Sequence, residues 1–139
     1  MEQTFSIRNT TKNDYPTLCD WWKWFRFPAP SLEMLPNDGN DGVIVMFDGV
    51  EVCAGFLYAT SSKSLFWCEF IVSNPKVKDR KVRKQAIKLL INSISELAKQ
   101  MGAKAIFTSL KNENLLQHYK DCGYTVNTTT AIEMTKIIK

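Results

Sequence analysis

The sequence predicts an α/β fold of the α+β kind, in which helices flank a mixed central sheet. Three observations lead to this prediction: apolar residues at helical spacing from Val82 to Met101, a hairpin signal at Asp48-Gly49, and several short apolar runs between turn residues. The chain has 139 residues, 45% of them apolar, which is enough to build one core and too little for two. We therefore expect a single domain over residues 1–139.

The first third of the chain is expected to hold one strand, one helix and a long connection. Phe5 to Arg8 alternates apolar and polar residues like a short strand, and Thr10, Thr11 or Asn13 can cap a helix over residues 14–25. Prolines at positions 28, 30 and 36 should prevent regular structure before the turn-forming residues 37–42. A connection of this length is more typical of a functional loop than of a simple linker.

Three antiparallel strands and the longest helix are expected in the middle of the chain. Residues 43–47 and 52–60 flank the Asp48-Gly49 turn, and a third strand runs over residues 65–72. The helix over residues 82–101 follows, with Gly102 where a C-terminal stop belongs.

The last third should contain a strand, a short helix and a final strand. Residues 105–108 read as a short buried strand, Asn112 can cap the following helix, and Gly123 stops that helix before a strand that begins at Tyr124. The element order is therefore β-α-β-β-β-α-β-α-β. The two strands that the long helix connects should lie side by side and parallel.

Positive charge gathers where the strand over residues 65–72 leads into the long helix. Seven basic residues stand close together: Lys76, Lys78, Arg80, Lys81, Arg83, Lys84 and Lys88. With the single Asp79 the segment carries +6, whereas the whole chain carries +4, so the remainder is negative. A strand that leads into a cationic helix start offers an anion both N–H groups and charge, which favours a phosphate-bearing ligand. A solvated basic helix face and a limited nucleic-acid contact remain alternatives.

Several classes of protein and site are not indicated. No stretch approaches the roughly 20 apolar residues of a membrane span, and residues 1–4 lack the features of a signal peptide, so we expect a cytoplasmic protein with no membrane contact. The four cysteines lie far apart without a C-x-x-C pair. This spacing favours reduced thiols and predicts neither a metal site nor a disulfide framework.

A motif near the end of the chain carries a family resemblance. Residues 112–124 read Asn-Glu-Asn-Leu-Leu-Gln-His-Tyr-Lys-Asp-Cys-Gly-Tyr. Together with the element order and the junction at Pro75, this segment resembles the GNAT superfamily of acyl-CoA-dependent N-acyltransferases, which has an Asn-x6-Tyr-x3-Gly-aromatic signature. The resemblance covers nearly the whole chain and is greatest to short single-domain members often carried by bacteriophages. It implies transfer of an acyl group, most simply acetyl, from acetyl-CoA (coenzyme A) to an amine by direct attack in a ternary complex.

The same resemblance implies where the cofactor binds. The backbone of Ile71 and Val72 would pair with the pantetheine arm, and Asn112 would either contact that arm or only cap its helix. The pyrophosphate would lie at the start of the long helix, against Lys81, Val82, Arg83, Lys84, Gln85 and Ala86. The family pattern Gln/Arg-x-x-Gly-x-Gly/Ala retains only its small last residue here. Lys84 replaces a glycine, so its side chain either crowds the pyrophosphate or contacts it.

Two residues are candidates for the chemistry. Tyr119 matches the family's tyrosine that donates a proton to the departing thiolate, and packing alone is the alternative role for such an aromatic. Glu69 is the only acid in the apolar run over residues 65–72, and a buried acid is costly unless it is paired or functional. It is the candidate general base, acting through a water, unless it belongs to a structural ion pair.

The acceptor side and the choice between functions rest on fewer residues. By resemblance, Trp22, Trp24 and Phe27 are candidates for binding the acceptor, which is a small-molecule amine or a protein lysine. A helix buries only one stripe, so some of these aromatics should belong to the core. Two other functions stay open: a catalytically silent GNAT-like binding protein, and a nucleic-acid-directed binder or base-modifying enzyme that uses the basic helix start. The sequence allows a monomer or a homodimer.

Overall fold

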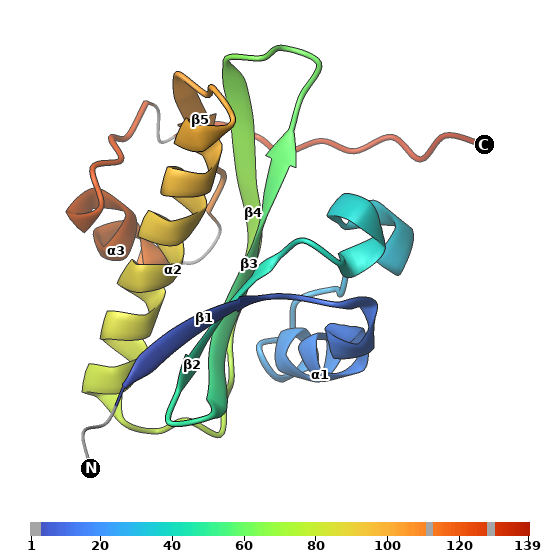
Figure 1. Cartoon of the computed structure of the whole chain (residues 1–139). Helices are drawn as coiled ribbons and strands as arrows, with labels where there is room; N and C mark the ends of the chain where they lie inside the picture. The colour runs from blue at the N-terminus through green and yellow to red at the C-terminus, as the bar shows by residue number, and fades with distance from the viewer. Residues whose placement is uncertain (1–3, 111–112, 128–129) are drawn as a thin grey trace.

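The computed structural model describes residues 4–110, 113–127 and 130–139, and places a single sheet between two helical layers (Figure 1). The sheet contains, in spatial order, β1 (Phe5–Asn9), β2 (Val43–Phe47), β3 (Val50–Ala59), β4 (Leu65–Ser73) and β5 (Ala105–Phe107). Neighbouring strands pair antiparallel except β4 and β5, which are parallel. The helices are α1 (Tyr15–Trp24), α2 (Arg80–Gln100) and α3 (Leu116–Asp121). The predicted mixed α/β fold class is therefore confirmed.

Two separate groups of buried side chains hold the layers together. On one face of the sheet, α2 buries an aliphatic stripe against β2, β3 and β4, and its members include Ala86, Leu90 and Ile94. On the other face, α1 buries Trp22 among mostly larger side chains that include Phe56. The spacing of apolar residues predicted α2 because each of its buried positions recurs at helical period on one side. Among the described residues, none of the helices has both the length and the apolar character needed to cross a bilayer.

Local chemistry explains where the elements begin and turn. Asp48 and Gly49 have positive φ angles of 50° and 82°, as the predicted two-residue hairpin requires. At the start of the first helical segment, the Asp14 carboxylate accepts the Thr11 N–H at 2.8 Å and also binds the Arg8 guanidinium at 2.8 Å. This capping interaction joins α1 to the edge of the sheet at β1.

The proline-rich connection is more regular than predicted. It contains the 3-10 helices η2 (Leu32–Met34) and η3 (Pro36–Gly39), since proline fits the first position of a helical turn. The buried hydroxyl of Thr10 donates to the Gly39 carbonyl at 2.7 Å and accepts the Gly42 N–H at 2.8 Å. These bonds fix the connection against the end of β1.

The strand predicted from Tyr124 is not observed. Residues 124–127 and 130–139 form neither helix nor strand. The Tyr124 N–H instead donates to the Tyr119 carbonyl at 3.0 Å, and its hydroxyl lies 3.0 Å from the Ser95 hydroxyl on α2. These contacts close the end of α3, so Tyr124 is held by the helices and does not pair with β5.

Candidate active site

The sheet opens along one edge of β4. β5 pairs only with Leu65, Phe66 and Trp67, whereas β3 continues to pair with β4 as far as Ser73. Within the described residues, the second half of β4 therefore has one edge without a strand partner. Unpaired N–H and C=O groups on a strand edge can bind an extended amide-containing ligand by the hydrogen bonds that a neighbouring strand would make.

A β-bulge lies in the same half of β4. The β3 register passes from Ala54 opposite Val72 to Phe56 opposite Glu69, so Phe70 and Ile71 together face Gly55. Phe70 has a φ of +61°, a left-handed conformation that is costly for a residue with a bulky side chain. The surrounding aromatic rings hold it there, because Trp22, Phe27 and Tyr58 all contact the Phe70 ring at centroid distances of 6.2 to 6.3 Å. Strained backbone of this kind is common at functional sites.

Tyr119 lies beside this opening, on the α2 side of the sheet. Its side chain is 2% exposed, and its hydroxyl lies 3.5 Å from the Cys68 sulfur and 3.5 Å from the Thr108 hydroxyl. Burial raises the pKa of the phenol well above its usual range, with a further contribution from Cys68. Burial likewise raises the pKa of the Cys68 thiol to about 12. Both groups therefore keep their protons at neutral pH.

Glu69 lies on the opposite face, which α1 covers. Directly opposite cross-strand neighbours share a face, and Glu69 stands opposite Phe56 of the α1-side core. Its carboxylate accepts the indole N–H of Trp67 at 2.8 Å. The carboxylate also contributes to the raised pKa of Tyr58, although burial of that phenol is the larger cause. The structure thus places the two predicted catalytic residues on opposite sides of β4, each next to its open edge.

The three predicted acceptor-binding aromatics lie in three different environments. Trp22 is 2% exposed within the core, and its indole nitrogen has no hydrogen-bond partner among the described residues. Phe27 is partly buried against Phe70, whereas Trp24 is 64% exposed and lies 5.5 Å beneath the Lys78 ammonium. Trp22 is therefore a core residue in this structure, because α1 buries the face that carries it. Phe27 and Trp24 remain accessible.

The start of α2 does not offer free amide groups in the way the sequence suggested. Asp79 caps the helix, and its carboxylate accepts the N–H groups of Lys81 at 3.0 Å and Val82 at 3.3 Å. An aspartate at this position accepts hydrogen bonds from the free N–H groups of the helix start, and its negative charge is favourable there. A phosphate that used these two amides would have to replace the Asp79 carboxylate.

The cations around this helix start nevertheless remain available. Lys81 and Lys84 are exposed and Arg83 is partly exposed, and none of the three forms an ion pair within the part of the chain that the structure describes. Val82 and Ala86 are buried against the sheet, so their side chains face away from solvent. Gln85 is exposed beside Lys84. Asn112, the remaining predicted cofactor contact, lies outside the described residues.

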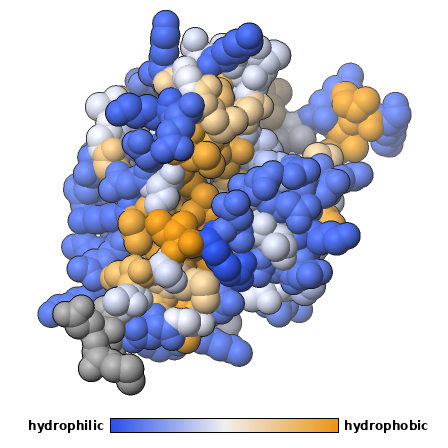
Figure 2. Space-filling model, in the orientation of Figure 1, coloured by the Kyte–Doolittle hydropathy of each residue, from blue (hydrophilic) through white to orange (hydrophobic). Residues whose placement is uncertain are grey.

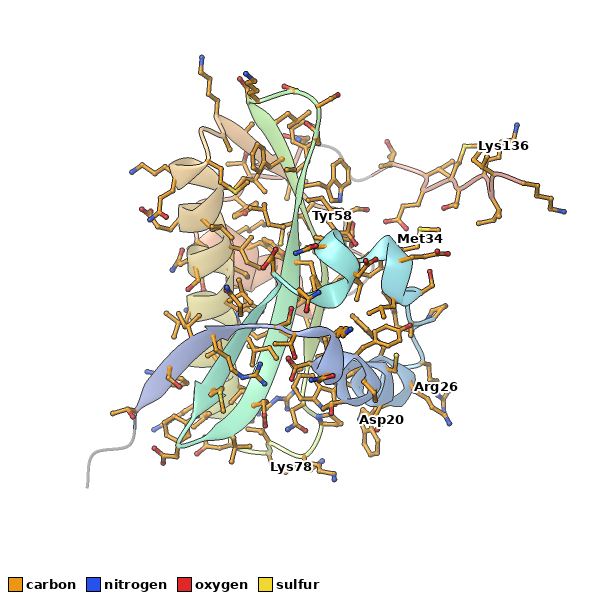
Figure 3. The ribbon with its side chains drawn as sticks, turned by 45° about the vertical axis from the view of Figure 1, so that its right-hand side comes forward. Asp20, Arg26, Met34, Tyr58, Lys78 and Lys136 are labelled. Carbon is orange, nitrogen blue, oxygen red and sulfur yellow. The ribbon has the colours of Figure 1, made fainter. Side chains whose placement is uncertain are left out.

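Sequence reasoning missed two groups that shape the site. Tyr58 packs on Phe70, and its hydroxyl donates to the Met34 carbonyl at 2.7 Å, so it ties η2 to the α1 face (Figure 3). Asp79 was counted only as a negative charge, although an Asp before a helix is an N-cap signal. The sequence does not indicate the strained backbone at Phe70, because nothing in a run of apolar residues distinguishes a bulge from a regular strand.

Known structures share this fold. An N-acetylglutamate synthase from Neisseria gonorrhoeae, crystallised with coenzyme A and L-arginine, aligns with a TM-score of 0.70 and 16% identity over 96% of this chain. The chain spans only 30% of that synthase. An aminoglycoside acetyltransferase from an uncultured soil metagenomic sample aligns with a TM-score of 0.65 and 15% identity over 97% of both chains. A glucosamine-6-phosphate N-acetyltransferase from Arabidopsis thaliana gives 0.60 and 15% over 98% of this chain and 99% of its own.

These alignments confirm the fold that the GNAT resemblance implied. No protein-family model and no curated protein matches the sequence.

Proposed function

We propose that this chain is an acyl-CoA-dependent N-acyltransferase, most simply one that transfers acetyl from acetyl-CoA to an amine. The observation that carries the proposal is the open edge of β4 beyond Trp67, with the hydroxyl of Tyr119 on one side of the strand and the carboxylate of Glu69 on the other. The shared fold with acetyltransferases, one of them crystallised with coenzyme A, supports it.

The cofactor would bind along β4 and reach the start of α2. The backbone of Ile71 and Val72 would pair with the amides of the pantetheine arm at the open edge. The pyrophosphate would then meet the side chains of Lys81, Arg83 and Lys84, which are close enough in sequence to approach one ligand from successive helical positions. In this proposal the Lys84 side chain contacts phosphate where other members of the superfamily use a glycine backbone.

Residues of this chain can carry out both proton transfers of the reaction. Acetyl-CoA supplies an activated acyl group, whose C–S bond breaks as the amine nitrogen forms the new C–N bond. Glu69 would accept the proton that the amine loses, through a water on the α1 face. Tyr119 would donate its proton to the departing thiolate from the α2 face, and burial keeps the phenol protonated before that step. The phenol regains a proton from solvent after the product leaves.

The acceptor would approach from the α1 face, because that face carries the proposed base. Phe27 and Trp24 are the accessible aromatics of the predicted acceptor set, and Tyr58 and Trp67 lie nearer to Glu69. Aromatic faces beside a carboxylate favour a cationic amine over a neutral or acidic compound. Small-molecule amines and protein lysines both meet this description.

Calorimetric titration of the purified chain with acetyl-CoA and with CoA tests the proposal. We expect binding, and we expect Arg83→Ala to weaken it roughly tenfold or more, since a charge-assisted phosphate contact contributes on the order of 1.5 to 3 kcal/mol. Lys12→Ala is the matched control: it removes one exposed positive charge from η1 (Lys12–Asp14), outside the basic segment. Equal weakening by both variants would indicate a general charge effect without a local contact. No detectable binding of CoA at millimolar concentration would refute the proposal and favour a GNAT-like binding protein.

A further inference from the structure

Burial opposes the proton transfer proposed for Tyr119. The Tyr119 side chain is 2% exposed and belongs to the aliphatic core under α2. Figure 2 shows mostly hydrophilic residues on the outward side of α2, so the apolar stripe of this helix faces inward and helps to enclose the phenol. Burial disfavours the charged form of a phenol, and donation of its proton leaves a phenolate. The transfer therefore needs a group that stabilises the phenolate oxygen as its charge develops.

Two side chains reach the Tyr119 hydroxyl within the described residues, and they differ as hydrogen-bond donors. The Cys68 sulfur and the Thr108 hydroxyl each lie 3.5 Å from it. Cys68 is fully buried, and a thiol is a weak donor. Thr108 is partly exposed, and its hydroxyl donates toward the phenol oxygen. Thr108 is therefore the better placed of the two to stabilise a phenolate.

The effects of these two groups on the phenol have opposite signs. Burial is the largest cause of the raised pKa of Tyr119, and Cys68 raises this pKa further. The hydrogen bond from Thr108 instead lowers the pKa of Tyr119. A hydrogen bond that lowers the pKa of a phenol is one that favours the phenolate. Thr108 thus offsets part of the cost that burial imposes on the proton transfer.

The strands β4 and β5 diverge at the Tyr119 hydroxyl. The last pair of the two strands is Trp67 with Phe107. Cys68 and Thr108 are the next residues along the chain after this pair, and both contact the Tyr119 hydroxyl. The hydroxyl therefore lies where the open edge of β4 begins. In the proposed function the cofactor follows this edge, so its thiolate would depart beside the same hydroxyl.

We propose that Thr108 is a positioning residue for the acyl transfer: its hydroxyl donates a hydrogen bond to the Tyr119 oxygen and stabilises the phenolate that remains when the phenol proton passes to the thiolate. In this step the O–H bond of Tyr119 breaks as the S–H bond of CoA forms, and the negative charge moves from sulfur to the phenolate oxygen. Solvent then returns a proton to the phenolate. A distance of 3.5 Å is long for such a bond, and hydrogen bonds between catalytic groups often shorten in the transition-state complex. This inference rests on the proposed function.

A kinetic double-mutant cycle tests the role of Thr108. Thr108→Val removes the hydroxyl at nearly constant volume, so kcat should fall roughly tenfold or more while the Kd for CoA holds, as expected for a hydrogen bond to a charged group. Thr108→Ser keeps a hydroxyl and should restore most of the turnover. In the Tyr119→Phe background, Thr108→Val should have little further effect, because no phenolate forms there. Thr125→Val makes the same change at an exposed position and should leave turnover unchanged.

Urea unfolding of the same four proteins of the cycle detects the hydrogen bond without any activity. The stability lost in the double variant should be smaller than the two single losses added together, because each single variant already breaks the bond. Additive losses would overturn the inference. So would a Thr108→Val variant as active as the wild type, or one that loses as much turnover in the Tyr119→Phe background as in the wild type; in these cases CoA binding and the proposed function still stand. A wild type that binds no CoA would overturn the proposed function and the role of Thr108 together.

Discussion

The two faces of β4 differ in composition, and each contributes a different part of the proposed chemistry. The face under α2 is aliphatic and closely packed, and it holds Tyr119 against Cys68 with almost no exposure. The face under α1 is aromatic, contains the strained Phe70, and presents Glu69 beside groups that remain partly accessible. A dry environment keeps the Tyr119 phenol protonated, whereas an accessible environment suits a base that must meet an acceptor. The sheet thus separates the two proposed proton-transfer groups by placing them in different layers.

Removing the hydroxyl of Tyr119 is the largest expected perturbation. Tyr119→Phe keeps the buried ring, so CoA affinity should hold while turnover falls by roughly 10² or more, the usual effect of losing a positioned proton donor. Tyr124→Phe is the matched control, because its ring lies 4.9 Å from that of Tyr119 and its hydroxyl bonds only to Ser95 among the described residues. Hydrolysis of acetyl-CoA and screens of polyamines and lysine peptides provide the assay. Equal turnover in both variants would contradict the assigned role.

The pH–rate profile tests Tyr119 a second time and also tests Glu69 on the opposite face of β4. Because burial raises the pKa of Tyr119, the phenol remains protonated, and turnover should show no basic limb from it below about pH 10. Glu69→Gln should abolish the acidic limb of the profile if Glu69 is the base. A profile that Glu69→Gln leaves unchanged would place the base elsewhere.

Truncating Phe70, on the face under α1, should lower the free energy of unfolding measurably. Phe70→Ala removes a ring that three aromatic side chains contact, and we expect a loss of about 2 kcal/mol in the free energy of unfolding. Phe70→Gly removes the same ring but relieves the positive φ, so it should be more stable than Phe70→Ala by about 1 kcal/mol. Urea unfolding of the three proteins measures both differences. If the glycine variant is the less stable one, the left-handed backbone at this position is not strained.

The attachment of α1 should depend on pH, and this is the smallest expected effect. The Arg8 guanidinium bonded to the Asp14 carboxylate holds the pKa of that carboxyl below its usual value, against the opposing effect of burial. A lowered folded-state pKa contributes stability above the unfolded-state value, and this contribution is lost as pH falls below about 4. Asp14→Asn should therefore cost about 1 kcal/mol at pH 7, a figure reduced for the partial exposure of both side chains, and almost nothing near pH 2.

Thermal unfolding of the wild type and Asp14→Asn across this pH range gives the comparison. A stability difference that persisted unchanged at pH 2 would mean that the charge of Asp14 does not attach α1 to β1.

Sequence reasoning predicted the fold well wherever a periodic pattern had only one structural solution. The helical spacing from Val82 to Met101 and the Asp48-Gly49 turn located α2 and the β2–β3 hairpin to within two residues. It failed at Tyr124, where a motif residue that could begin a strand is instead used to close α3. The Tyr124 hydroxyl also lies 3.0 Å from the Ser95 hydroxyl on α2, a tertiary contact that no local pattern contains.

The candidate site was predictable in its residues and less so in its arrangement. Tyr119 and Glu69 were singled out by a motif and by an acid in an apolar run, but their placement on opposite faces depends on the strand register. The Asp79 cap shows a second limit, since charge counting predicts attraction for phosphate and cannot show that an internal carboxylate already occupies the helix end. Trp22 was assigned to the acceptor by resemblance, and a helix pattern could not correct this, because it shows which residues share a face and does not show which face is buried.

The extra residue at Phe70 reverses the face of the sheet to which each later side chain of β4 points. In a regular strand, residues four apart point the same way, but Cys68 belongs to the core under α2 and Val72 to the core under α1. Side chains at even-numbered positions of β4 therefore point to one face of the sheet before residue 70 and to the other face after it. One continuous strand can in this way supply buried side chains to both layers, which is consistent with a sequence that is apolar from residue 65 to 72 except at Glu69.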